Sequence, residues 1–204
     1  MLNKEFISGL GLNLNDLQIS TLQTYAEIVL NKNKEFNLTA AKTIQEIFDR
    51  HICDGLQAAA LLKQNGFDKK TGADFGTGAG FIGVSVAIAL PEIKIYLVDS
   101  LQKRTKFLQW IIYKLGLKNL EVLTSKIGQD KLPLSFDFIM ERAMGEIDDI
   151  LPLCLNALKE GGAFLALLSK NTQSKVLPSG EHPYSLPNDK EILGRKIAVY
   201  YGYN

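Results

Sequence analysis

A glycine-rich segment in the first half of the chain constrains the fold more than any other feature. It lies between a short apolar run and an apolar helical pattern and reads Asp74-Phe-Gly76-Thr-Gly78-Ala-Gly80-Phe-Ile-Gly83. Glycines at such a junction allow a tight turn and let a ligand lie against bare backbone, while the helix start offers unpaired N–H groups. Three alternate glycines are costly for a plain turn, so the segment predicts a ligand-binding loop.

Short apolar runs alternate with helical patterns from this segment onward. Continuous apolar runs of this length are typical of strands buried on both faces of a parallel sheet. The alternation predicts an α/β, Rossmann-like fold with a mostly parallel twisted sheet and helices on both faces. The strand candidates are Ala73–Phe75, Ile93–Val98, Leu120–Leu123, Phe136–Met140 and Ala163–Leu168, then a weak one at Tyr184–Leu186 and a stronger one at Lys196–Tyr201.

Apolar stripes at three- and four-residue spacing mark the intervening helices. One stripe covers Leu108–Leu115 and ends at Gly116, a residue suited to a helix C-cap. Another covers Ile147–Leu158 and is predicted to end at the pair Gly161-Gly162.

The first seventy residues also show helical periodicity. They predict an N-terminal helical extension over residues 1–70, ahead of a ligand-binding core over residues 71–204. Polar stretches at Asn31–Asn37 and Asn65–Gly72 are predicted to be connections. The two parts are expected to form one structural domain.

Composition excludes several classes of protein. Hydrophobic residues make up 46% of the chain and charged residues 22%, which excludes a mainly disordered chain. The 23 Lys and Arg residues nearly balance the 22 Asp and Glu residues, so the net charge is +1. A nucleic-acid partner would therefore have to meet a local basic patch, because no basic field covers the whole molecule.

Neither Cys53 nor Cys154 belongs to a C-x-x-C pair, which favours reduced thiols over a disulfide or a metal site. There is no signal-peptide core, and the longest apolar run, Phe81–Leu90, is too short to span a bilayer. We expect a cytoplasmic protein without membrane contact. No long heptad pattern is present, so a monomer is expected.

Two cofactor interpretations fit the loop. Gly78-x-Gly80-x-x-Gly83 matches a dinucleotide fingerprint. The same segment, taken from Asp74, matches the first motif of methyltransferases that use S-adenosylmethionine (SAM). An acid at this place suits the methionine ammonium and is awkward beside a pyrophosphate, so Asp74 favours SAM. Asp99 ends the second strand, where an acid accepts both ribose hydroxyls of either cofactor.

A basic cluster, Lys103, Arg104 and Lys106, opens the helix that follows Asp99. Cations in a first turn oppose the helix dipole by roughly 0.3–1 kcal/mol each when exposed. The cluster is either a solvated helix face or an anion-facing patch beside the cofactor, suited to a phosphate backbone.

Five motifs in order are similar to those of one family. They are Asn37-Leu-Thr39, Arg50-His51-Ile-Cys-Asp54-Gly-Leu56, Asp74–Gly83, Asp99-Ser100-Leu-Gln-Lys103-Arg104 and Glu141-Arg142-Ala143. With these motifs the chain resembles the RsmG family, also called the glucose-inhibited division protein B family. The resemblance implies a methyltransferase acting at N7 of a guanine in bacterial small-subunit (16S) ribosomal RNA, with that RNA or the ribosomal subunit as its partner.

The loop and the resemblance together assign the site residues. The predicted SAM-binding residues are Asp74, Gly76, Gly78, Gly80, Phe81, Asp99, Ser100, Ile127, Gly128 and Arg142. The predicted RNA-binding residues are Arg50, His51, Lys103, Arg104, Lys106 and Lys170.

Methylation of N7 needs no general base, because this nitrogen has a lone pair and no proton. Arg142 is the residue we expect to place the base, by donating to guanine O6 or to a phosphate. The alternative for Arg142 is a structural salt bridge to Glu141 or Asp137. His51 is expected to serve in helix packing or RNA contact rather than as a catalytic base.

Two other functions stay open at this point. The dinucleotide fingerprint would also fit an NAD-type oxidoreductase or sensing module. Departures from the family pattern at Gly55, Ile82, Gly128 and Glu141 would fit a methyltransferase fold without catalysis that binds ribosomes.

Overall fold

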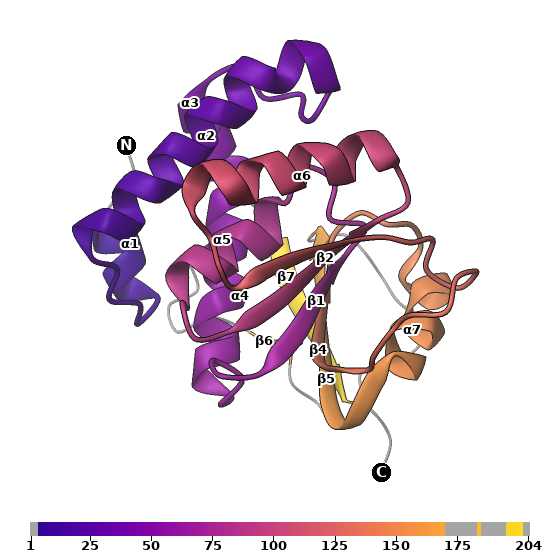
Figure 1. Cartoon of the computed structure of the whole chain (residues 1–204). Helices are drawn as coiled ribbons and strands as arrows, with labels where there is room; N and C mark the ends of the chain where they lie inside the picture. The colour runs from indigo at the N-terminus through magenta and orange to yellow at the C-terminus, as the bar shows by residue number, and fades with distance from the viewer. Residues whose placement is uncertain (1–3, 170–182, 185–194, 202–204) are drawn as a thin grey trace.

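A computed structural model describes residues 4–169, 183–184 and 195–201 of the chain. The strands in these ranges are β1 (Thr71–Phe75), β2 (Lys94–Asp99), β3 (Leu120–Thr124), β4 (Phe136–Glu141), β5 (Leu158–Ser169), β6 (Pro183–Tyr184) and β7 (Arg195–Tyr201). They form one sheet of order β3-β2-β1-β4-β5-β7-β6 (Figure 1). Strands β1 to β5 pair in parallel, and β7 lies antiparallel between β5 and β6. The predicted mostly parallel α/β fold is confirmed.

Helices cover both faces of the sheet, as predicted. They are α1 (Lys4–Gly9), α2 (Asp16–Phe36), α3 (Ile44–Ile47), the π-helix η1 (Phe48–Ile52), α4 (Cys53–Gln64), α5 (Phe81–Ala89), α6 (Gln102–Leu115) and α7 (Ile147–Asn156). One face shares a hydrophobic core with α1, α2, α4, α5 and α6, and the other packs against α7 (Figure 1). Side chains alternate between the faces of a strand. Ala73 and Phe75 of β1 therefore face α7, and Asp74 faces α5.

The parallel register brings three strand ends together. Phe75, the last residue of β1, is paired with Val98 of β2 and with Glu141 of β4. The next residue of β2 is Asp99, and the next after β4 is Arg142. The glycine-rich loop therefore starts between Asp99 and Arg142, at the carboxyl edge of the sheet where open α/β folds bind ligands.

The connection predicted at Asn31–Asn37 is wrong, because α2 continues to Phe36. Lys32 Nζ lies 2.8 Å from the Glu35 carboxylate, at a three-residue spacing that supports a helix. Asn37 ends the helix with a φ of 52°. The polar stretch is thus the solvent face of the last helical turns.

The helix predicted over Ile147–Leu158 also differs from the structure. Helix α7 ends at Asn156, and Leu158 is the first residue of β5, where it pairs with Phe136. Gly161-Gly162 therefore lies within β5 rather than at a helix end. Pairing with β4 overrides the apolar periodicity at this point.

The remaining element predictions agree with the structure where it describes them. The connection predicted at Asn65–Gly72 follows α4, although its last two residues already belong to β1. The weak tail strand is found as β6, and residues 185–186 lie outside the described ranges. Within those ranges, no helix is both long and apolar enough to cross a membrane.

Candidate functional site: a glycine-rich loop between two carboxylates

The loop after β1 has a backbone that only glycines adopt easily. Gly76, Gly78 and Gly80 have φ values of 61°, 60° and 91°. The Thr77 N–H donates to the Val98 carbonyl of the neighbouring strand at 3.0 Å, and the Gly80 N–H donates to the Thr77 carbonyl at 2.8 Å. The chain therefore turns back sharply, and Gly80 caps the N-terminus of α5.

The Asp74 carboxylate stabilises the conformation of this loop through hydrogen bonds. One carboxylate oxygen, Oδ2, accepts hydrogen bonds from Thr77 Oγ1 at 2.6 Å and from the Gly83 N–H at 2.8 Å. The side chain is buried, and burial raises the pKa of Asp74 to about 6, against the lowering effect of both hydrogen bonds. Asp74 thus carries a negative charge near neutral pH at a point with little solvent, where a ligand cation would be strongly favoured.

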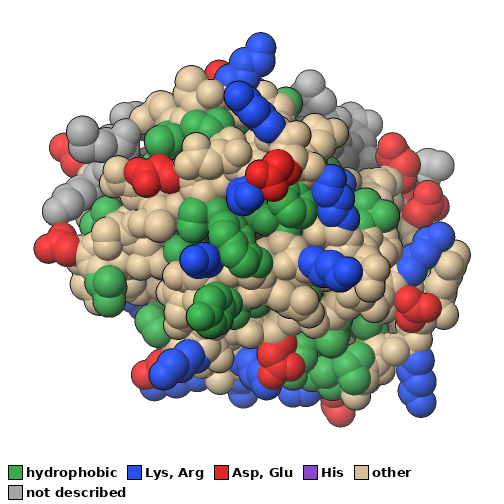
Figure 2. Space-filling model, turned by 45° about the horizontal axis from the view of Figure 1, so that its top comes forward, with side chains coloured by type: hydrophobic (Ala, Val, Ile, Leu, Met, Phe, Trp, Pro, Cys, Tyr) green, Lys and Arg blue, Asp and Glu red, His purple; other side chains and the backbone are tan. Residues whose placement is uncertain are grey.

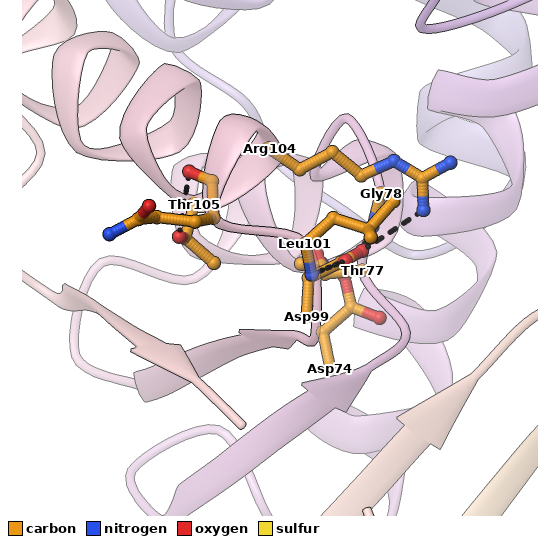
Figure 3. Close-up of polar contacts among 8 residues, drawn as sticks. Asp74, Thr77, Gly78, Asp99, Leu101, Arg104 and Thr105 are labelled. Carbon is orange, nitrogen blue, oxygen red and sulfur yellow. Dashed lines mark hydrogen bonds and ion pairs between the residues drawn. The ribbon is translucent and has the colours of Figure 1, made fainter. Parts of the chain in front are cut away.

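Asp99 closes the other side of the loop (Figure 3). Its Oδ2 accepts from the Gly78 N–H at 2.9 Å, and its Oδ1 accepts from the Leu101 N–H at 2.9 Å. Arg104, on the first turn of α6, reaches back to the same Oδ2 at 3.3 Å. The carboxylate is therefore fixed in orientation, with only 3% of its residue surface exposed.

The arrangement fits a nucleoside cofactor with a cationic amino-acid tail. An added Cβ at Gly78 would meet only the Gly76 carbonyl, at 3.9 Å, so a ligand has room to lie against this part of the backbone. Asp99 supplies the acceptor that ribose hydroxyls need, and Asp74 supplies a buried negative charge. Ser100 is exposed directly after β2.

The turn after β3 lies beside the same edge. The Ser125 N–H donates to the Asp99 carbonyl at 3.1 Å, which fastens this turn to the end of β2. Ile127 is half-buried among residues of the α7-side core. Gly128 has a φ of 82° and backs onto Leu153 of α7. The structure thus places Ile127 and Gly128, both predicted to bind SAM, at the edge of the site.

Arg142 makes contacts that sequence analysis missed. Its Nη1 donates to Asp54 Oδ2 at 2.7 Å and to the Arg50 carbonyl at 3.0 Å, and its Nη2 lies 3.0 Å from His51 Nδ1. Arg142 therefore forms a salt bridge with Asp54, which is neither of the partners expected for it, Glu141 or Asp137. Asp137 pairs instead with Lys159, at 3.0 Å.

His51 is enclosed by neighbours from three parts of the chain. Its ring stacks on Phe81, the first residue of α5, with centroids 4.0 Å apart and planes 13° apart. Its Nε2 lies 2.7 Å from Thr39 Oγ1. The packing role expected for His51 is what these contacts show.

The turn after Arg142 is strained and lies beside the loop, with Ala143 exposed. Ala143 has a φ of 61°, which is costly for a residue with a Cβ. Glu141 Oε1 accepts the Met144 N–H at 2.7 Å, and burial raises the pKa of Glu141. The Met144 side chain covers Gly76, where an added Cβ would lie 2.5 Å from Met144 Cγ.

The predicted basic residues separate into different environments. Lys103 donates from Nζ to the Glu35 carbonyl at 2.6 Å and lies over the Phe36 ring, so it fastens the end of α2 to α6. Arg104 pairs with Asp99 at the cofactor side. Lys106 and Arg50 are exposed, and Lys170 lies outside the described residues.

Helix α2 also contributes to the loop, a contact that was not predicted from the sequence. Tyr25, fully buried, donates from Oη to the Ala79 carbonyl at 2.9 Å, and burial raises its pKa well above the ordinary value. The helical periodicity of the first seventy residues gives no sign of this partner. Asp54 was detectable in principle, because it follows His51 at the three-residue spacing of one helix face.

Comparison with known proteins supports the same assignment. The model of the family named rRNA small subunit methyltransferase G (GidB) matches residues 18–184. The ribosomal RNA small subunit methyltransferase G of Acetivibrio thermocellus is 34% identical, over 98% of this chain and 80% of that protein. The protein of the same name from Ruthia magnifica is 30% identical, over 97% of this chain and 94% of that protein.

Similarity to solved structures extends to more distant methyltransferases. TrmN from Thermus thermophilus superposes with a TM-score of 0.57 at 20% identity, over 73% of this chain and 49% of that chain. This likeness shows the fold alone. The family match and the curated relatives decide between the two cofactor interpretations, in favour of methyl transfer. The chain belongs to the rRNA small subunit methyltransferase G family, and it is a methyltransferase whose cofactor is SAM.

Proposed function

We propose that this chain methylates N7 of a guanine in the 16S RNA of the small ribosomal subunit. The observation that supports it most is the rigid pair of carboxylates, Asp74 and Asp99, on either side of a glycine loop in a chain of this family. The names of the relatives supply the small-subunit RNA, and the resemblance of the sequence motifs supplies the base and the atom.

Each carboxylate has a distinct task toward SAM. Asp99, already oriented by the Gly78 and Leu101 N–H groups, would accept the ribose hydroxyls. Asp74, ionised above a pH of about 6, would offset the charge of the methionine ammonium. When bound, SAM supplies a sulfonium-linked methyl group that a nucleophile attacks in line.

The chain needs to place the guanine rather than to remove a proton. A ring nitrogen with a lone pair reacts once it lies about 3–3.5 Å from the methyl carbon in a site that excludes water. Arg142 lies at the end of β4 beside the loop, with 22% of its side chain exposed. Among the described residues, three of its N–H groups are engaged by Asp54, Arg50 and His51. A guanidinium has five N–H donors, so two are left to meet guanine O6 or a phosphate.

The outer face of α6 is our candidate for the RNA path. Lys106, Trp110, Tyr113 and Lys114 recur at helical spacing and are all exposed, and α6 contains no acidic residue. In Figure 2, Lys and Arg side chains lie among hydrophobic ones on the side that comes forward, with some acidic side chains between them. Cations bind phosphates and aromatic rings stack on unpaired bases. Because α6 starts three residues after Asp99, RNA on this face would lead to the methyl donor.

Methyl transfer to purified subunits tests the proposal. Small subunits from cells that lack this gene are incubated with the protein and radiolabelled SAM, and the modified base is mapped. Label on a 16S guanine that becomes sensitive to N7-specific cleavage is the expected result. SAM binding in calorimetry without any transfer would refute it and support a ribosome-binding protein without catalysis. Label on another RNA or another atom would refute the assigned substrate.

The state and location of the protein are also proposals. We propose that it acts as a monomer, which sedimentation equilibrium checks directly. A cytoplasmic location follows from a ribosomal substrate, and cell fractionation measures it.

A further inference from the structure

We propose that His51 is a positioning residue. As a neutral imidazole protonated on Nε2, it fixes the direction in which the Arg142 guanidinium points into the site. The inference concerns the orientation of Arg142, and it rests on the proposed function only for the identity of the substrate that Arg142 meets.

The hydrogen-bond partners of His51 determine its tautomer. A guanidinium has only donors and stays charged in proteins, so His51 Nδ1, 3.0 Å from Arg142 Nη2, has to accept. The ring proton must then lie on Nε2, which faces Thr39 Oγ1 at 2.7 Å. Thr39 Oγ1 is itself held in place, because it accepts the Ala41 N–H at 3.0 Å.

The imidazole plane is fixed as well as its proton. His51 stacks nearly parallel on Phe81, which is 4% exposed and begins α5 directly after Gly80 of the cofactor loop. The Arg142 guanidinium carbon lies 5.9 Å from the centroid of the same Phe81 ring. His51 therefore has one ring orientation in which Nδ1 faces Arg142 and Nε2 faces Thr39.

Asp54 and His51 contribute in different ways to the orientation of the Arg142 guanidinium. Asp54, 5% exposed in its side chain, contributes the opposite charge at 2.7 Å and anchors Nη1. His51 contributes a directional acceptor to the other nitrogen, Nη2. With both nitrogens held, the planar fork has little freedom to rotate. The segment before β1 thus decides where a residue some ninety positions later points.

A matched pair of variants separates the two ring nitrogens. In His51→Asn the amide oxygen takes roughly the place of Nδ1 and can still accept from Arg142, but the contact with Thr39 is lost. In His51→Gln the amide nitrogen reaches roughly the place of Nε2 and can still donate to Thr39, but the acceptor for Arg142 is lost. Both variants lose the stack on Phe81, so the difference between them reports on the contact with Arg142.

The variants are compared in methyl transfer to subunits and in SAM binding. Misplacement of a substrate-positioning group by about 1 Å can reduce the rate about a hundredfold. We expect His51→Gln to lower kcat/KM for the RNA substrate about tenfold or more relative to His51→Asn. Because Arg142 is also a predicted SAM-binding residue, the Kd for SAM is measured for both variants by calorimetry and kcat/KM is compared at saturating SAM. Equal kcat/KM in the two variants, with equal melting temperatures, would overturn the inference.

Nitrogen NMR supplies a test that does not depend on RNA. In the wild-type chain, the ¹⁵N shifts of the His51 imidazole should show a protonated Nε2 and an unprotonated Nδ1. The guanidinium nitrogens of Arg142 should give separate, slowly exchanging signals in the wild type and in His51→Asn, and averaged signals in His51→Gln. A proton on Nδ1 in the wild type, or unchanged Arg142 signals in His51→Gln, would refute the inference. Absence of methyl transfer by the wild type would refute the proposed function, and the NMR result would still decide the role of His51.

Discussion

Replacing Asp74 by Asn removes one buried charge below the cofactor loop and keeps the hydrogen bonds of the loop. The amide oxygen of Asn can still accept from Thr77 Oγ1 and from the Gly83 N–H, which both bind a single oxygen of the acid. The expected result has opposite signs for two measurements. The free energy of unfolding should rise at neutral pH, while the affinity for SAM should fall.

The magnitude follows from the pKa of the folded state. Burial raises the pKa of Asp74 from an ordinary 3.8 to about 6. One pKa unit corresponds to about 1.4 kcal/mol, so ionisation of Asp74 costs the folded state about 3 kcal/mol. Between these two pKa values the folded chain binds more protons than the unfolded chain, so wild-type stability falls as the pH rises through this range. The stability of Asp74→Asn should not decrease in this way, because the amide does not ionise.

Urea unfolding from pH 3.5 to pH 8 measures the difference. The two chains should be similar in stability near pH 3.5, and Asp74→Asn should be more stable by about 3 kcal/mol near pH 8. SAM affinity of the wild type should fall below a pH of about 6, when Asp74 becomes neutral, and should stay low in Asp74→Asn at every pH.

Asp137→Asn serves as the control of opposite sign. Burial acts to raise the pKa of Asp137, but hydrogen bonds from Lys159 and from the Thr71 N–H outweigh it and lower the pKa. Asp137→Asn should therefore lose stability at neutral pH, with a difference from wild type that disappears at low pH. Parallel stability curves for wild type and Asp74→Asn, or unchanged SAM affinity in Asp74→Asn, would refute the role assigned to Asp74.

Other substitutions test the loop and the helix packing. Asp99→Asn should weaken SAM binding about tenfold or more, since hydrogen bonds to a charged group contribute about 1.5–3 kcal/mol. Calorimetry measures the affinity, and an unchanged melting temperature shows that the variant is folded. Gly78→Ala should also weaken SAM binding, because the φ of 60° at Gly78 is costly for a residue with a Cβ and because the added methyl group would occupy space that the ligand needs. An unaltered SAM affinity would contradict the assignment of this loop to the cofactor. Gly55→Ser, which restores the family residue, should lower the melting temperature at a cost of about 1–3 kcal/mol, because its Cβ would lie 2.5 Å from Ser85 Cβ. Adding Ser85→Gly should restore most of that loss, and failure to do so would show that another contact sets the cost.

Local pattern explains which parts of the fold were predictable. Apolar runs and stripes reflect which face of an element is buried, so the strands and the helix ending at Gly116 were found from spacing. The errors at Asn31–Asn37 and at Leu158 arose where pattern and context disagree. A polar helical end has the composition of a connection, and a strand paired with β4 can continue a helical apolar stripe.

The candidate site divides in the same way. The glycine loop and Asp99 were predictable because their residue types and their places at the ends of predicted strands can be recognised from neighbouring residues in the sequence. Lys103 and Arg104 were predicted together as RNA contacts. In the structure, Lys103 joins the end of α2 to α6, and Arg104 pairs with Asp99. A basic residue in a sequence reveals its charge but not the partner that folding brings to it.

The amino-acid sequence by itself determined the order of strands and helices, the loop with positive φ angles and the acids that flank it, because each depends on neighbours along the chain. The tertiary structure alone decided what holds Arg142. Its partners His51 and Asp54 lie 91 and 88 residues earlier, and only the packing of η1 and α4 against α5 brings them to the end of β4. Residues far apart in the sequence are brought into contact when apolar faces of helices and strands are buried against one another. Contacts formed in this way leave no local sequence pattern from which they can be inferred.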